Sequence, residues 1–262
     1  MIFDSHAHYD DPRFDEDRDA LLSSLAEKGV GAVVNAASDL PSSRAGLALA
    51  ERYPFLWSAA GVHPSESETL DAAALAEIEA LAAHPRVVAI GEIGLDYYWE
   101  DNPPRPIQRA AFEQQLALAK RLEMPVIVHS RSASQETFEI LSAHRPRGVV
   151  HCFSGSAELA REYAAMGMYV GFTGVVTFKG AHKPLEAARA AGLDHILVET
   201  DCPYLAPAPF RGKRCDSSLL PYTVRALAEA LGVAPREVER ASWENACALY
   251  GLELPFPPAS VL

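Results

Sequence analysis

The sequence predicts an α/β protein in which strands and helices alternate around one (β/α)8 barrel. Short apolar runs alternate with longer segments that carry Ala and Leu at helical spacing. The length of 262 residues fits a barrel of ~250 residues. No Pro/Gly/Ser-rich linker or change in composition divides the chain. We therefore expect a single domain over residues 1–262.

Strands are expected at eight runs rich in Val, Ile and Phe. These runs are continuously apolar, which is typical of parallel strands whose outer face is covered by helices. The expected strands are 2–6, 31–35, 56–60, 87–92, 126–129, 149–151, 169–172 and 196–199.

Helices are expected between these runs, where apolar residues recur at a period close to 3.6. The expected helices are 15–28, 42–52, 72–83, 107–123, 134–144, 157–166, 184–191 and 219–231, followed by one or two closing helices over 235–250. An open doubly wound sheet is the main alternative architecture. The first strand is not followed by the Gly-rich phosphate fingerprint of such sheets, so the barrel is favoured.

Composition indicates an ordinary folded protein. With 23 Lys and Arg against 35 Asp and Glu, the formal net charge is −12, which argues against broad electrostatic attraction to nucleic acids or anionic membranes. No apolar run approaches the roughly 20 residues that cross a bilayer, and the chain starts without a signal-peptide pattern, so we expect a cytoplasmic protein. The four cysteines are scattered without a zinc or redox spacing.

Five of the nine histidines follow or end the expected strands. In a parallel barrel the carboxyl ends of the strands meet at one mouth, where active sites form. His6 and His8 are two residues apart on an extended chain, so their side chains point to the same side. The further N and O donors at strand ends are Glu92, His129, His151 and Asp201.

Six donors of this kind exceed what one tetrahedral ion requires. The sequence therefore predicts two divalent ions with a carboxylate between them, an arrangement that activates water in hydrolysis. We expect Asp201 and Glu92 to be the catalytic carboxylates, with Asp201 also able to act as a general base. Glu199 is expected to orient a neighbour, and Asp4 to form hydrogen bonds within the barrel.

The order of these motifs resembles that of the TatD family of metal-dependent hydrolases over nearly the whole chain. The resemblance is carried by blocks starting at Asp4-Ser5-His6-Ala7-His8, Gly61-Val62-His63-Pro64, Gly91-Glu92-Ile93-Gly94-Leu95-Asp96-Tyr97-Tyr98, His129-Ser130-Arg131, His151-Cys152-Phe153-Ser154-Gly155 and Glu199-Thr200-Asp201-Cys202-Pro203. It implies a TIM-like barrel of the metal-dependent hydrolase type. It also implies a deoxyribonuclease, commonly a 3′–5′ exonuclease, that acts on single-stranded DNA ends.

With this resemblance, His63 and Arg131 become candidates for phosphate contact, because each is a hydrogen-bond donor near the expected metals. Arg211, Lys213 and Arg214 form the densest cationic cluster and are expected to contact a nucleic-acid backbone. Cys215-Asp216 stands where the family usually has Asn and an acidic residue. That departure affects the expected substrate specificity more than the metal site.

Several alternatives stay open on the sequence. The same metal site could hydrolyse another ester or amide, such as a D-aminoacyl-tRNA, or the protein could bind metal without turnover. The mixed His and carboxylate ligands suit Zn, Mn or Co, and Mg is compatible with more water ligands.

Overall fold

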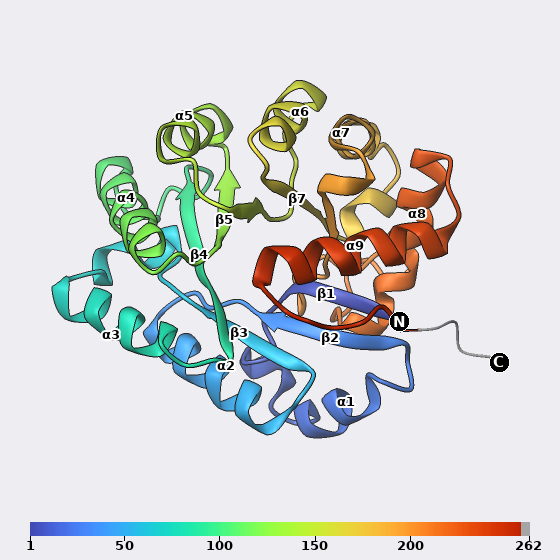
Figure 1. The fold of residues 1–262 in the computed structure, drawn as a ribbon, viewed down its shortest axis with the longest axis horizontal. Coiled ribbons are helices and arrows are strands. Elements are labelled where there is room, and N and C mark those ends of the chain that lie inside the picture. Colours follow the sequence, from blue (N-terminus) through green and yellow to red (C-terminus); the bar gives the residue numbers. More distant parts are fainter. Residues whose placement is uncertain (258–262) are drawn as a thin grey trace.

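The strands form one parallel barrel, and the computed structural model describes residues 1–257 (Figure 1). The eight strands follow chain order around the sheet, from β1 beside β2 to β7 beside β8. Their bounds are β1 (Ile2–Ala7), β2 (Val30–Asn35), β3 (Leu56–Ala60), β4 (Val87–Asp96), β5 (Val126–Arg131), β6 (Gly148–Val150), β7 (Tyr169–Phe172) and β8 (Ile196–Val198). This confirms the predicted fold.

Helices surround the strands, and one more helix covers the end of the barrel (Figure 1). Their bounds are α1 (Arg18–Ser24), α2 (Leu40–Arg52), α3 (Ala72–Ala82), α4 (Arg105–Arg121), α5 (Ser134–His144), α6 (Ala157–Ala165), α7 (His182–Ala191), α8 (Leu220–Leu231) and α9 (Pro235–Tyr250). Within residues 1–257 no helix combines the length and apolar character that a bilayer crossing requires.

Most element ends lie within two residues of the expected ones, and β4 and the first helix differ by more. β4 continues beyond Glu92 to Asp96, because it pairs with β5 as far as Arg131. The first helix covers only Arg18–Ser24, and the chain then turns through Gly29 at a φ of 84° into β2. The closing segment is a single helix, α9. Residues 258–262 of the expected domain lie outside the described residues.

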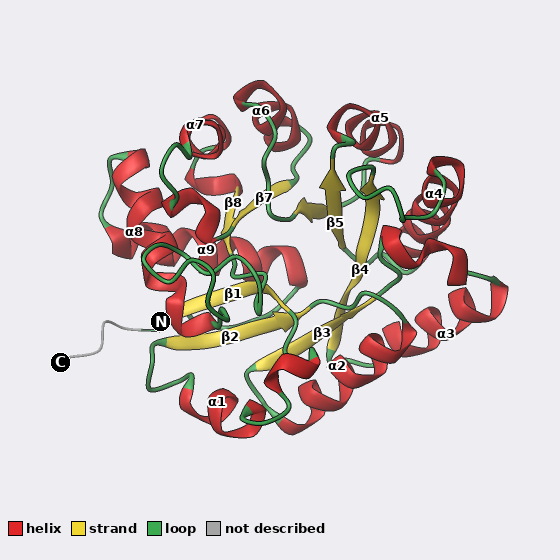
Figure 2. Ribbon diagram, turned by 180° about the vertical axis from the view of Figure 1, so that it is seen from behind, coloured by secondary structure: helices red, strands yellow, loops and turns green. Residues whose placement is uncertain are grey.

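The amino end of the barrel is closed by α9, which crosses in front of the strands in Figure 1. Trp243 of this helix packs edge-on against Phe3 of β1, with 5.6 Å between the ring centroids. Trp57 of β3 also stacks on Phe3, with 6.4 Å between the ring centroids. Because these large apolar side chains fill the amino end among residues 1–257, the barrel opens to solvent at its carboxyl end, which faces the viewer in Figure 2.

The seam between the last and first strands is joined by the buried carboxylate of Asp4. It accepts hydrogen bonds from the Thr200 hydroxyl (2.7 Å), the Thr200 N–H (3.0 Å) and the Ser217 hydroxyl (2.6 Å). Burial raises the pKa of Asp4 to about 6, although these donors oppose the shift. Asp4 therefore has the expected hydrogen-bonding role, and it fixes the chain on both sides of the seam.

Close approach of β4 and β5 depends on Gly94. Its φ is 142°, and a Cβ built there would lie 2.0 Å from the carbonyl oxygen of His129. A larger residue at this position would separate the two strands where Gly94 pairs with His129.

We expect Gly94→Ala to lower the free energy of unfolding by about 2 kcal/mol or more, because it adds a backbone clash to an unfavourable φ. Gly167→Ala is the matched control: Gly167 also has a positive φ, of 77°, but a Cβ there meets nothing within 4 Å. Urea unfolding measures both. Equal losses for the two variants would contradict the role given to strand contact.

Candidate metal centre

The six expected metal-site residues lie together at the carboxyl end of the barrel. Their ligand atoms fall into groups whose members are all within 4.8 Å of one another. His6, Glu92 and His129 lie within strands β1, β4 and β5, and His8, His151 and Asp201 lie one to three residues beyond β1, β6 and β8. The parallel barrel thus brings together positions up to 195 apart in the chain, from His6 to Asp201. These groups are His6 with Glu92 and His151, His6 with His8 and Asp201, and His63 with Glu92 and His129.

The carboxylate of Glu92 lies at the centre of this cluster. Its Oε1 is 2.7 Å from His151 Nε2 and 2.9 Å from His129 Nδ1. Its Oε2 is 3.4 Å from His6 Nε2 and 3.6 Å from His8 Nε2. The two oxygens of one carboxylate thus face two different pairs of imidazoles.

Asp201 completes the side of the cluster formed by the first strand. Its Oδ1 is 3.3 Å from His8 Nε2 and 3.5 Å from His6 Nε2. The backbone of Asp201 is left-handed, with a φ of 59°, a conformation that Asp tolerates better than most residues. Its N–H donates to the His6 carbonyl at 2.9 Å. Together these features direct the carboxylate over the two histidines.

Burial and carboxylate charge act in opposite directions on the imidazoles. Burial alone would lower the pKa of His8, but the hydrogen bond to Asp201 and nearby carboxylate charge raise it to about 9. The same competition, with Asp96 as the first partner, raises the pKa of His129 to about 9. At His6 burial prevails and lowers the pKa to about 4. A divalent cation suits such a cluster, because it binds neutral imidazoles and carboxylate oxygens together.

Asp96 orients one of these imidazoles, a role that the sequence analysis did not assign. Its Oδ2 is 3.3 Å from His129 Nε2, while its Oδ1 accepts the Tyr98 N–H at 2.9 Å. A carboxylate on one ring nitrogen fixes the direction of the other, which here faces Glu92. The spacing in the sequence could have indicated this role, because Asp96 follows Glu92 by four residues in one strand and so lies on the same face.

Glu199 supports the site from beneath, as the sequence led us to expect. Its Oε1 accepts the Cys152 N–H at 2.5 Å, and its Oε2 accepts the Ser5 hydroxyl at 3.3 Å. Burial raises the pKa of Glu199 to about 8. These contacts hold the chain segments that carry His151 and His6.

His63 lies beside the metal cluster. Its Nε2 is 3.7 Å from Glu92 Oε1, and its ring centroid is 4.4 Å from that of His129. Its Nδ1 is occupied by Ser65, whose hydroxyl lies 2.8 Å away and whose N–H donates at 3.1 Å. Only Nε2 therefore faces the cluster.

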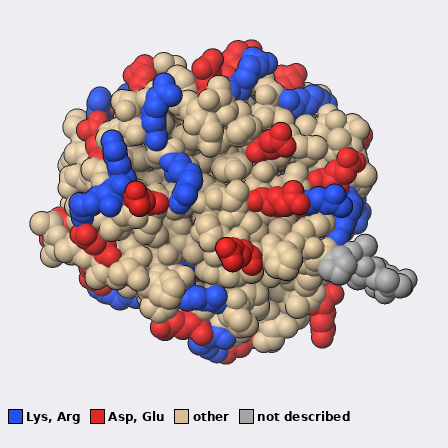
Figure 3. Space-filling view, in the orientation of Figure 1, with Lys and Arg blue, Asp and Glu red and all other residues tan. Residues whose placement is uncertain are grey.

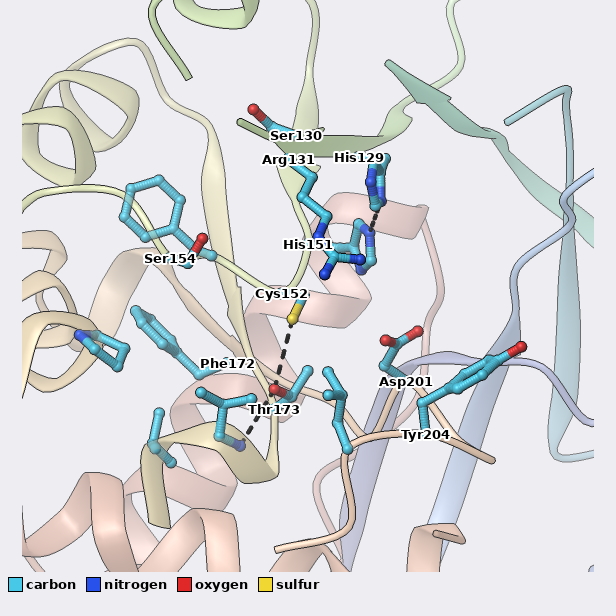
Figure 4. Close-up of a pocket in the computed structure, with 15 residues that line it drawn as sticks. His129, Ser130, Arg131, His151, Cys152, Ser154, Phe172, Thr173, Asp201 and Tyr204 are labelled. Carbon is cyan, nitrogen blue, oxygen red and sulfur yellow. Dashed lines mark hydrogen bonds between the residues drawn. The ribbon is translucent and has the colours of Figure 1, made fainter. Parts of the chain in front are cut away.

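A pocket of about 340 Å³ opens beside the cluster (Figure 4). His129, His151 and Asp201 line one side of it. Arg131 extends from the end of β5 toward His151 in Figure 4 and also lines the pocket. The opposite wall is largely apolar and is formed by Phe153, Phe172, Val175, Val176, Pro184 and Leu205.

The three cationic side chains after β8, which were expected to contact a nucleic-acid backbone, lie outside the pocket. None of Arg211, Lys213 and Arg214 lines this pocket within the described part of the chain. The Arg214 guanidinium is held by both carboxylate oxygens of Asp17, at 2.7 and 2.6 Å. Arg211 lies over the ring of Phe178, 4.6 Å from its centroid. On the opposite face of the molecule, Lys and Arg side chains lie among Asp and Glu side chains (Figure 3).

Comparison with known proteins agrees with the resemblance seen in the motifs. Residues 3–251 match the family model described as TatD related DNase. The uncharacterized metal-dependent hydrolase YabD of Bacillus subtilis is 40% identical over 253 residues, covering 95% of this chain and 99% of YabD. A protein of Cronobacter sakazakii named 3′-5′ ssDNA/RNA exonuclease TatD is 35% identical over 258 residues, covering 95% of this chain and 97% of the relative.

A solved structure of a TatD homolog has the same fold as this chain. The crystal structure of YjjV, a TatD homolog from Escherichia coli K12, superposes with a TM-score of 0.91 at 32% identity, covering 96% of this chain and 98% of YjjV. The family match spans nearly the whole chain and includes every residue of the cluster around Glu92. The protein therefore belongs to the TatD-related DNase family of metal-dependent hydrolases.

Proposed function

We propose that the protein hydrolyses phosphodiester bonds of single-stranded DNA from the 3′ end, at a centre where Glu92, the histidines around it and Asp201 would hold two divalent ions. The observation that carries this proposal is the geometry of Glu92, whose Oε1 faces His129 and His151 while Oε2 faces His6 and His8. A carboxylate with each oxygen directed to a separate donor group is the arrangement that holds two ions close together.

The donors divide naturally into two ligand sets. His6, His8 and Asp201 surround one position, and His129 and His151 surround the other. Mixed imidazole and carboxylate donors suit Zn, Mn or Co, and Mg when more of its ligands are water. When bound, such ions supply a water nucleophile at neutral pH and offset negative charge on the phosphoryl oxygens.

The remaining chemistry belongs to the side chains of the pocket. Asp201 lines the pocket and is 16% exposed, so it can accept a proton from an attacking water and deliver it to the leaving oxygen. Arg131 and the Nε2 of His63 would donate to the phosphoryl oxygens, a role that Arg131's position in the pocket wall and the distance of 3.7 Å from His63 Nε2 to Glu92 Oε1 support. A pocket of about 340 Å³ is within the range of sites that hold small organic groups, and its apolar wall suits a terminal nucleoside.

Two further facts support nucleic acid as the substrate. The Cronobacter relative is named as a 3′–5′ exonuclease of single-stranded DNA and RNA. Lys213 and Arg211 lie exposed in the loop after β8 that also carries Asp201. With a net charge of −12, we expect weak, salt-sensitive binding that is centred on the metal site.

One observation favours a second candidate function, the hydrolysis of an aminoacyl ester such as a D-aminoacyl-tRNA on the same metal site. A second pocket, of about 420 Å³, is lined by His8 and by the three carboxylates Asp10, Asp11 and Asp39. An ammonium group would be attracted there, whereas a phosphate would be repelled.

We expect Glu92→Gln to lower the rate of DNA hydrolysis at least about 100-fold, because it removes the bridging anion. His129→Ala should have a similar effect. In the unmodified protein, a divalent ion at 100-fold excess over its dissociation constant should raise the free energy of unfolding by about 2.7 kcal/mol, and Glu92→Gln should lose most of this. Nuclease assays and thermal unfolding with and without metal measure both.

Glu162→Gln is the matched control, since Glu162 is exposed on α6 and carries the same chemical change. It should keep both activity and metal stabilisation. If Glu92→Gln and His129→Ala, both folded by circular dichroism, still degrade DNA at the wild-type rate, the site assignment is wrong.

We expect 5′-labelled single-stranded DNA to shorten one nucleotide at a time from its 3′ end in the presence of a suitable divalent metal, and a chelator to stop the reaction. Product analysis on gels, repeated with each metal, measures direction and ion preference. A D-aminoacyl-tRNA is assayed in parallel. Release of the amino acid without any nucleotide release from DNA would replace the nuclease proposal with the second candidate.

A further inference from the structure

An exposed aromatic pair lies beside the metal centre. Tyr98 is 54% exposed and Trp99 is 58% exposed, and they lie two and three residues after the end of β4 at Asp96. Their rings meet edge to face with 4.8 Å between centroids. The other two tryptophans, Trp57 and Trp243, are only 7% and 3% exposed. Two adjacent large aromatic rings in solvent contribute little to folding, so their exposure requires another explanation.

The Arg131 guanidinium joins this pair to the pocket. It lies 4.0 Å from the ring centroid of Tyr98 and 5.1 Å from that of Trp99. Arg131 also lines the pocket together with His129. No carboxylate among residues 1–257 lies within ion-pair distance of it, unlike Arg214, which Asp17 neutralises. Arg131 therefore presents a free positive charge between the aromatic pair and the metal centre.

The position of the pair relative to the metal centre is fixed by Asp96. One oxygen of its carboxylate is 3.3 Å from His129 Nε2, and the other accepts the Tyr98 N–H at 2.9 Å. The backbone of Asp96 is itself held, since its N–H donates to Gln108 at 2.8 Å and its carbonyl accepts from Gln108 at 2.9 Å. A single carboxylate thus orients a ligand of the cluster and the start of the aromatic segment.

Charge decides on which side of the metal centre a nucleic-acid strand can run. On the side of His8 the mouth is lined by Asp10, Asp11 and Asp39. Asp11 is paired with Arg13, at 2.8 Å, whereas Asp10 and Asp39 have no ion-pair partner among residues 1–257, and these two carboxylates repel phosphates. On the side of His129 it presents Arg131 and the aromatic rings. A strand whose scissile phosphate lies at the metal centre is therefore directed across the second side.

We propose that Tyr98 and Trp99, with Arg131 between them and the pocket, form a stacking platform for an unpaired base of the substrate strand near the scissile phosphate. This inference rests on the proposed nuclease function and deepens it by naming a binding site for a base. Arg131 lies closer to the Tyr98 ring, so Trp99 offers the more open surface for a base. Stacking on an aromatic face tolerates any sequence, which fits a strand read without sequence preference.

The test compares two substrates of the metal-loaded full chain, a single-stranded oligonucleotide and an abasic dinucleotide, which is a small diester without aromatic rings. Trp99→Ala should lower kcat/KM on the oligonucleotide about 10-fold more than on the small diester, because only the oligonucleotide has a base to stack. The loss should appear mainly in KM. Trp99→Phe keeps an aromatic face and should retain most of the wild-type kcat/KM on the oligonucleotide. Ile107→Ala is the control, because it removes an exposed apolar side chain of α4, and it should keep the wild-type ratio of the two kcat/KM values.

A second arm locates the base. Oligonucleotides carry one abasic residue at successive positions from the 3′ end. At one position the wild-type protein should lose about 10-fold in kcat/KM, and there Trp99→Ala should cause no further loss, as expected when both changes remove one contact.

The outcomes distinguish a failure of the stacking platform from a failure of the proposed nuclease function. If the wild-type protein degrades the oligonucleotide but Trp99→Ala affects both substrates equally, or no abasic position removes its effect, the platform is wrong and the nuclease proposal stands. If the wild-type protein hydrolyses the diester but no oligonucleotide, both the nuclease proposal and the platform fail. Thermal unfolding shows whether each variant is folded.

Discussion

The site depends on one buried anion, the carboxylate of Glu92, which is 3% exposed and lies within 3.7 Å of a ring nitrogen of each of five imidazoles. Nearby imidazole charge holds the pKa of Glu92 well below its usual range despite the opposing effect of burial. A charge at this depth is tolerated only where opposite charge or hydrogen-bond donors meet it from every side. The ends of at least four strands must therefore converge on this one side chain, and the barrel is the fold that achieves this.

Other features follow from that requirement. β4 continues beyond Glu92 because its pairing with β5 places His129 beside it, and Gly94 allows the two strands to approach. The seam between β8 and β1 is joined by Asp4, which fixes the residues beside His6 and Asp201. With α9 closing the amino end, the mouth above Glu92 is where a substrate can enter, and that mouth is acidic on one side and carries Arg131 on the other.

Periodicity predicted the strands and helices well, because a covered parallel sheet requires continuous apolar runs and its helices require a repeating apolar face. Element ends were less predictable. The extension of β4 to Asp96 depends on pairing with a strand about 35 residues later, and no local pattern reports that pairing. The six candidate ligands could be chosen from the sequence because they lie near the expected strand ends. The contacts of Asp96 and the exposure of Tyr98 and Trp99 depend on tertiary structure and could not be predicted from the sequence. Arg214 looked available in the sequence, but Asp17, almost 200 residues away, neutralises it.

The sequence by itself determined the fold class, the family and the chemical character of the site, since these depend on residue types and on their order relative to the strands. Tertiary structure decided which oxygen of Glu92 faces which imidazole, and it placed the acidic side chains on one side of the mouth and Arg131 on the other. The physical reason is distance: ligation, ion pairing and stacking act over a few ångströms. Their partners lie tens to hundreds of residues apart in the chain, and only the folded barrel sets the distances between them.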